Sequence, residues 1–195
     1  MNAAKKRLLR KHILELSREL YLHPITDRAI TENIKERHPN LTKSCVREHM
    51  HYLAAKDLAV LHKKKNTQSI GITPRGIDVL DGAIKVRGIE PSDSQSTRLS
   101  YKKELRRGIL LYCNSFKESY NEDTEIHAEF RASGFKNLIL EEIRFHTWYL
   151  EQKKFLEVKS YSAVGGLIFL ARITADGIDL LENTIADAGV SNDAD

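Results

Sequence analysis

Residues 52–80 read YLAAKDLAVLHKKKNTQSIGITPRGIDVL and contain the turning point of the predicted fold. The first letters end a helical pattern, and residues 58–61 form a short apolar run typical of a strand. Residues 63–69 are polar and predict a turn, after which residues 70–73 predict the returning strand. Pro74 is favoured at the first position of a helix. The stretch therefore predicts a helix, a β-hairpin and a further helix.

Upstream of the hairpin the pattern predicts three helices. Apolar residues recur at helical spacing over residues 5–22, and Pro24 ends that segment. Thr26 begins a candidate capping sequence for a second helix, which stops before Pro39. A third helix, capped by Asn40 or Thr42, is expected to run to about Lys56. The complete order is helix, helix, helix, hairpin, helix.

The same pattern occurs twice in the 195 residues. Residues 72–81 (ITPRGIDVLD) match residues 173–182 (ITADGIDLLE) at an offset of 101. Further upstream, residues 46–61 match 143–158 at an offset of 97, and residues 9–14 match 105–110 at 96. Three collinear matches indicate an internal duplication. The largest change of offset lies between Leu61 and Ile72, which predicts a loop that differs in length between the copies.

Each copy is expected to form one domain, in a mainly helical α+β protein. The predicted domains are residues 1–90 and 99–189, each with three helices, a hairpin wing and a C-terminal helix. Residues 91–98 are polar with one proline and predict a linker. Residues 190–195 are interpreted as a polar tail.

This order of elements is that of a winged helix-turn-helix domain. The run YLAAKDLAVL…IGITPRGIDVL resembles bacterial winged-helix regulators, in which a recognition helix, a strand, a basic wing and a Thr-x-x-Gly helix start follow each other. Both copies are also similar to small winged-helix proteins of Mu-like prophages, which end in a Gly-Val/Ile-x-Pro element like Gly88-Ile-Glu-Pro91. The second copy departs from them, because Ala188-Gly-Val190 lacks the proline. The resemblance implies a tandem winged-helix fold and a transcription regulator or accessory DNA-binding factor of a phage or mobile element.

The net charge of +4 conceals an asymmetry. Residues 1–90 carry 18 Lys and Arg against 10 Asp and Glu, whereas residues 91–195 carry 13 against 17. A basic half joined to an acidic half predicts a polyanionic partner for the first half only, and double-stranded DNA fits the fold.

The predicted DNA-binding face of the first copy combines the third helix with the wing. At about 100° per residue, Val46, Met50 and Leu53 point inward and a polar face points outward. Such a face can reach base edges and phosphates in the major groove, and lysines on a hairpin can contact phosphates. The candidate DNA-binding residues are Thr42, Lys43, Ser44, Arg47, His51, Lys63, Lys64 and Lys65.

The corresponding face of the second copy has a different character. Ile139 and Leu140 stand at the positions of Thr42 and Lys43, and Phe145 and Trp148 replace Glu48 and His51. Apolar and aromatic side chains there predict a protein interface, most simply in a homodimer, with another protein partner as the alternative. The candidate interface residues are Ile139, Leu140, Phe145 and Trp148.

Several alternatives remain open at this stage. Arg47 recurs as Arg144, which favours a structural role, such as pairing with Glu48 or with the first helix, over reading a base. The lysines of the wing can be a merely solvated turn, and Phe145 and Trp148 can be covered by the linker or the first domain. His49 and its repeat His146 are interpreted as core histidines bonded to backbone rather than as ligands or pH switches. A non-enzymatic adaptor or phage inhibitor built on tandem winged helices is the second functional hypothesis.

Other classes of function receive little support from the sequence. No nucleotide-binding, zinc-protease or nucleophile-elbow motif occurs, so we expect no enzyme, no cofactor and no metal site. No run of about 18 apolar residues predicts a membrane span. Cys45 and Cys113 lack the spacing of metal ligands and are expected to be inert thiols of a cytoplasmic protein.

Overall fold

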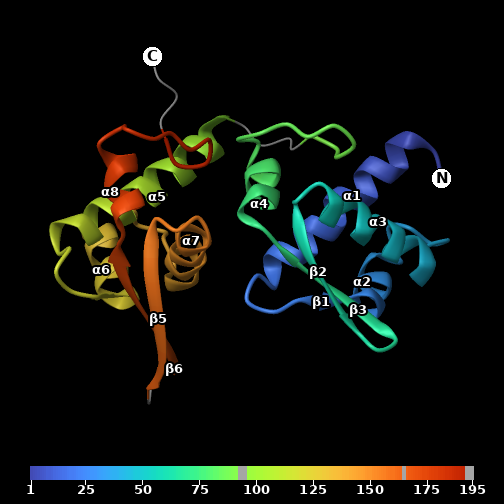
Figure 1. Cartoon of the computed structure of the whole chain (residues 1–195), viewed down its shortest axis with the longest axis horizontal. Helices are drawn as coiled ribbons and strands as arrows, with labels where there is room; N and C mark the ends of the chain where they lie inside the picture. The colour runs from blue at the N-terminus through green and yellow to red at the C-terminus, as the bar shows by residue number, and fades with distance from the viewer. Residues whose placement is uncertain (92–95, 164–165, 192–195) are drawn as a thin grey trace. The chain divides into compact units, whose positions relative to one another are not determined.

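A computed structural model describes residues 1–91, 96–163 and 166–191 of the chain. It divides into two compact units, residues 1–95 and 96–195. Each unit combines helices with a three-stranded antiparallel sheet, which confirms the predicted α+β class (Figure 1).

The first unit contains four helices and three strands among its described residues. Its sheet has the order β1-β3-β2, with β1 a two-residue strand on the outer side of β3. In chain order the elements are α1 (Ala3–Glu19), β1 (Ile25–Thr26), α2 (Asp27–Ile34), α3 (Lys43–Ala55), β2 (Ala59–Lys64), β3 (Thr67–Ile72) and α4 (Pro74–Asp81).

The second unit repeats this order among its described residues. Its sheet has the order β4-β6-β5. The elements are α5 (Ser96–Ser115), β4 (Asn121–Glu122), α6 (Asp123–Ala132), α7 (Leu140–Gln152), β5 (Leu156–Ala163), β6 (Gly166–Ile173) and α8 (Ala175–Leu181).

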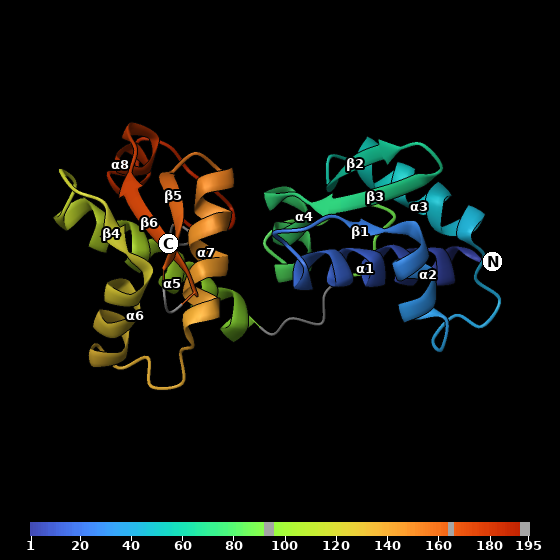
Figure 2. The ribbon, with the colours of Figure 1, turned by 90° about the horizontal axis from the view of Figure 1, so that it is seen from below.

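The core of each unit lies between the helices and the sheet. In the first unit, α1 packs against α3, α4 and β3 (Figure 2). The apolar side chains predicted to point inward from α3 are fully buried, and equivalent positions of the second unit are buried too. Buried residues of the first unit include Leu9, Ile13, Ile30, Val46, Met50, Leu53, Ile70 and Ile77, and those of the second include Leu105, Ile109, Ile126, Ile143, Leu150 and Leu180.

Side chains determine where the helices begin. Thr26 and Thr42 precede α2 and α3, and each hydroxyl accepts a hydrogen bond from a first-turn backbone amide. Thr73 caps α4 in the same way, and Pro74 occupies the first turn. Gly82 then ends α4 with a φ of 83°, a left-handed conformation that glycine adopts without a Cβ clash.

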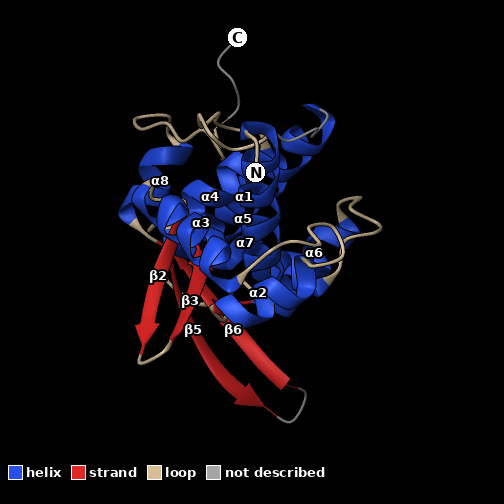
Figure 3. Ribbon diagram, turned by 90° about the vertical axis from the view of Figure 1, so that its right-hand side faces the viewer, coloured by secondary structure: helices blue, strands red, loops and turns tan. Residues whose placement is uncertain are grey.

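The hairpins account for the changing offset between the repeats. Strands β2 and β3 have six residues each, whereas β5 and β6 have eight (Figure 3). Lys64 pairs with Thr67 at the end of the first hairpin, and Ala163 pairs with Gly166 at the end of the second. The second hairpin is therefore longer by two residues in each strand.

The predicted boundaries need three corrections. Helix α5 begins at Ser96, so residues 96–98 of the predicted linker are helical, while residues 92–95 lie outside the described part. Val190 is buried, so the predicted tail begins inside the second unit, and residues 192–195 lie outside the described part. The predicted turn over residues 63–69 is mostly strand, because only Lys65 and Asn66 stand between β2 and β3.

Candidate nucleic-acid interface

An arginine of the first helix holds the third helix in each unit. In the first unit, Arg10 Nε donates to His49 Nδ1 at 3.2 Å, and its Nη1 donates to the carbonyl of Gly88 at 2.9 Å. Its guanidinium carbon also lies 3.4 Å from the centre of the Tyr52 ring. This arginine clamp fixes α3 relative to α1 and to the segment after α4.

The second unit repeats the arginine clamp. Arg106 donates to His146 Nδ1 at 3.1 Å and to the carbonyl of Gly189 at 2.9 Å, and it lies over Tyr149. Both histidines are core residues as predicted, but their partner is an arginine rather than backbone. Burial lowers the pKa of His49 and His146, and the neighbouring arginine lowers each pKa further.

Arg47 on α3 connects three elements of the first unit. Its Nε donates to Asp27 at the start of α2 at 2.5 Å, and its Nη2 donates to the carbonyl of Asn66 in the wing at 2.5 Å. Arg144 makes the same two contacts in the second unit, with Asp123 at 2.6 Å and the carbonyl of Leu167 at 2.6 Å. This geometry favours the structural role for Arg47, although with Asp27 rather than with Glu48 or the first helix.

Asp27 forms ion pairs with two basic residues of α3 beneath the candidate face. Besides Arg47, Lys43 Nζ lies 3.4 Å from the buried Asp27 carboxylate. Burial acts to raise the pKa of Asp27, but the hydrogen bonds and charges of Arg47 and Lys43 outweigh it, so the pKa lies below its ordinary value. Lys43 is thus a member of this ion cluster as well as a candidate phosphate contact.

The remaining candidates of the first unit are exposed around the junction of α3 and the wing. Thr42, Lys43 and Ser44 are exposed at the beginning of α3, and His51 is exposed two turns later. We call Thr42, Lys43 and the wing residue Asn66, which the Arg47 contact ties to α3, the helix–wing corner of this unit. It is polar at all three positions.

The three lysines of the wing are exposed and do not share one face. Lys63 and Lys64 are consecutive residues of β2, so their side chains leave opposite faces of the strand. Lys65 stands in the turn with a φ of 48°, a left-handed backbone that non-glycine residues adopt rarely. The lysines therefore surround the tip of the hairpin with positive charge.

The helix–wing corner of the second unit is apolar. Ile139 is 58% exposed and Leu167 is 40% exposed. Leu140, which follows Ile139, is half-buried. They replace Thr42, Asn66 and Lys43 respectively. Phe145 and Trp148 are half-buried, with ring centres 6.2 Å apart.

Sequence reasoning missed Asp27, Asn66 and Leu167 as parts of this region. Asp27 and Asp123 occupy matching positions of the repeats, so the duplication could have revealed a shared partner for Arg47 and Arg144. Leu167 was hidden because its alignment with Asn66 depends on the length of the hairpin.

Other chemistries find little support in the described part of the chain. It contains no group of three or more His, Cys, Asp and Glu placed to hold a metal ion. Cys113 is buried, which raises the pKa of its thiol to about 12. None of the helices described is of a length and apolar character that would cross a lipid bilayer. No known family model and no curated protein matches this chain.

Proposed function

We propose that this chain is a non-enzymatic tandem winged-helix protein whose first unit binds double-stranded DNA. The element order and the strand order β1-β3-β2 support the winged-helix interpretation. In this fold the third helix enters the major groove and the wing contacts the neighbouring backbone. A transcription regulator or an accessory DNA-binding factor is the proposed role.

The observation that carries the proposal is the contrast between the two helix–wing corners. The frame behind them is shared, since Arg47 and Arg144 make equivalent contacts. On this common frame the first unit presents exposed hydroxyl and amine donors with three lysines beside them, whereas the second presents Ile139, Leu140 and Leu167. Donors and cations suit a phosphate backbone, and the apolar corner does not.

The proposed roles of individual residues follow from their contacts. Lys63, Lys64 and Lys65 contact phosphates around the wing, and Lys43 contacts a phosphate near the start of α3. Ser44 and His51 face base edges from the exposed side of α3. Arg47 positions α3, α2 and the wing, and it carries no base-reading role in the proposal.

The second unit is proposed to hold a partner through its apolar helix–wing corner, most simply a second copy of the chain. A two-fold dimer would present two first units to two half-sites of a palindrome. The alternative of an adaptor, in which both units bind proteins, is favoured by the same apolar corner and predicts no DNA binding.

Fluorescence anisotropy on a labelled mixed-sequence duplex at several salt concentrations tests the DNA-binding proposal. We expect affinity to fall steeply with salt, because binding releases counterions from phosphates. Replacing Lys63, Lys64 and Lys65 by alanine is expected to reduce the slope of log affinity against log salt by up to about 3.

The matched control replaces Lys117, Lys136 and Lys154 by alanine. These lysines are exposed in the second unit, and Lys154 shares the positive φ of Lys65. The control is expected to keep the salt slope of the wild type. A wild type that fails to bind at about 50 mM salt contradicts the proposal, and equal slopes in the two triple variants remove the wing from it.

A further inference from the structure

A groove runs between α5 and α6 in the second unit. It has a volume of about 700 Å³, within the range of small-molecule sites. It follows α5 from Ser100 to Ser115, a rise of about 22 Å at 1.5 Å per residue. All its lining residues belong to this unit.

Two replacements between the repeats make the lining of this groove different from the matching region of the first unit. In the first unit, His12 of α1 and His38, in the loop after α2, meet at 3.1 Å between ring nitrogens and bridge the same seam. The matching residues of the second unit are Gly108 and Phe135. Gly108 supplies no side chain, and a Cβ there would lie 2.6 Å from the ring of Phe130, so the ring occupies the space next to α5.

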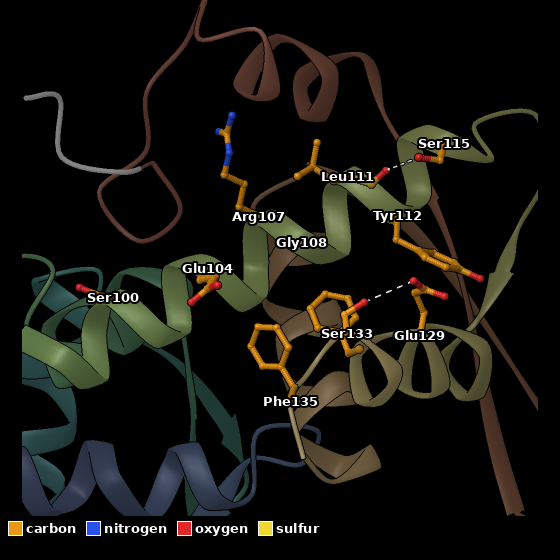
Figure 4. A pocket seen from close by; sticks show the side chains of 11 residues that line it. Ser100, Glu104, Arg107, Gly108, Leu111, Tyr112, Ser115, Glu129, Ser133 and Phe135 are labelled. Carbon is orange, nitrogen blue, oxygen red and sulfur yellow. Dashed lines mark hydrogen bonds between the residues drawn. The ribbon is translucent and has the colours of Figure 1, made fainter. Parts of the chain in front are cut away.

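Aromatic rings form the apolar part of the groove. Phe130 and Phe135 pack with their ring centres 5.2 Å apart, and Tyr112 lies farther along α5 (Figure 4). The faces of such rings carry partial negative charge and attract cations.

The polar groups of the groove are mostly acceptors. Glu104 and Glu129 are exposed carboxylates that line it from α5 and from α6. The hydroxyl protons of Ser133 and Ser115 are already donated, to Glu129 at 3.4 Å and to the carbonyl of Leu111 at 3.1 Å. The carboxylates also act on Tyr112, whose pKa is raised by burial first and then by the charges of Glu125 and Glu129.

The one guanidinium in the lining does not offset these acceptors at the rings. Arg107 Nη2 lies 3.5 Å from the carbonyl of Leu181, to which it donates. Figure 4 shows Arg107 pointing away from Glu129, Ser133 and Phe135, which lie on the other side of α5.

We propose that the groove between α5 and α6 is a binding site for a small organic cation that carries an apolar group. The apolar group lies against Phe130 and Phe135, and the negative charge of Glu104 and Glu129, which flank these rings toward opposite ends of the groove (Figure 4), attracts the cationic nitrogen. This site is independent of the proposed DNA-binding face, and neither proposal requires the other.

Titration of the ¹⁵N-labelled full chain with 2-phenylethylamine, followed by NMR, tests the site. A cation of this size is expected to bind at about millimolar concentration. The amide signals of residues 100–115 and 129–135 are expected to shift, while those around His12 and His38 do not. The neutral 2-phenylethanol and the anionic 3-phenylpropionate are expected to bind more weakly, in that order.

Variants separate a cation site from nonspecific apolar binding. Glu104→Gln with Glu129→Gln is expected to weaken the binding of 2-phenylethylamine by about tenfold, because it removes both carboxylate charges from the groove. Glu118→Gln, an exposed carboxylate outside the groove, is expected to leave it unchanged. Equal binding of the amine and the alcohol, unchanged affinity in the double variant, or no shift along α5 would overturn the proposal.

Discussion

At the scale of single residues, each unit contains a neutral histidine that accepts a hydrogen bond from an arginine. Arg10 and Arg106 donate to Nδ1 of His49 and His146, so these nitrogens must be unprotonated acceptors. A proton on Nδ1 of either ring would face the guanidinium that donates to this nitrogen in the folded chain. The clamp is thus a structural device that works only with the uncharged imidazole.

This device predicts a pH-dependent stability. The pKa of His49 and His146 lies below 6.5 in the folded chain and returns toward 6.5 on unfolding, so the unfolded chain binds more protons just below that pH. The free energy of unfolding should therefore fall as pH drops below about 6.5, by up to about 1.4 kcal/mol per pH unit for each histidine that stays neutral. Urea unfolding between about pH 7.5 and pH 5.5 measures this slope.

Two variants test the contribution of His146. His146→Gln keeps a side-chain acceptor for Arg106 but does not titrate, so its slope should be smaller than that of the wild type. His23→Gln changes an exposed histidine and should leave the slope unchanged. Identical slopes in the wild type and His146→Gln would contradict the assignment. Asp27 acts in a separate pH range. The stability that comes from its lowered pKa is lost only as pH falls below the ordinary value of 3.8.

At the scale of elements, the Thr-x-x-Gly sequence joins the third helix to the last one. The Thr73 hydroxyl accepts from the amide of Gly76 at 3.1 Å and donates to the carbonyl of Asp57 at 2.8 Å, just after α3. Thr174 repeats both bonds with Gly177 and with the carbonyl of Lys154. The glycine is needed because the chain leaving the third helix passes directly over it.

Alanine at these glycines is expected to destabilise the unit that contains it. A Cβ on Gly76 would lie 2.2 Å from the carbonyl oxygen of Leu58, and one on Gly177 would lie 2.3 Å from that of Phe155. Backbone must move in either case, so each of Gly76→Ala and Gly177→Ala should cost on the order of 2–4 kcal/mol in unfolding free energy. Gly71→Ala is the matched control, since the nearest atoms to its Cβ would be 3.9 Å away. A loss as large at Gly71 as at Gly76 would contradict this explanation.

The sequence predicted the elements better than the contacts between them. Helical spacing, caps and the duplication located the helices and both hairpins, because those signals are local or repeated. The two-residue strands β1 and β4 were missed, since so short a segment has no periodicity. The partner of Arg47 was missed because Asp27 lies 20 residues away and only the fold brings it near. The α5–α6 groove was also missed, because its lining residues lie on α5, on α6 and just after α6, and no local pattern marks them.

At the scale of the whole molecule, the two units share the contacts that hold their helices and hairpin together, but they differ in the helix–wing corner. The clamps and the Arg–Asp pairs are present in both units, so the same contacts hold the frame of each unit. The helix–wing corners differ at all three positions. This is consistent with the proposed separation of DNA binding from self-association.

Replacing the helix–wing corner of the second unit with the residues of the first is expected to dissociate the proposed dimer into monomers. The variant combines Ile139→Thr, Leu140→Lys and Leu167→Asn, and light scattering after size exclusion should report the mass of one chain instead of two. Leu111→Asn, at an exposed apolar residue elsewhere in the second unit, should keep the wild-type mass. A wild type with the mass of one chain, or a dimer that survives the triple change, would contradict self-association through this corner.

The longer hairpin of the second unit grew by an even number of residues in each strand. The extra residues lie at the tip, because the pairs nearer the core match in both hairpins: Ala59 pairs with Ile72 as Leu156 pairs with Ile173. Side chains alternate between the faces of a strand, so an unchanged register keeps these residues on the same faces in both units. The ladder below the insertion therefore kept its parity, and Leu167 still offers its carbonyl to Arg144 as Asn66 does to Arg47. The length of the hairpin can therefore change at its tip, one pair of residues at a time, while the core beneath it keeps the same contacts.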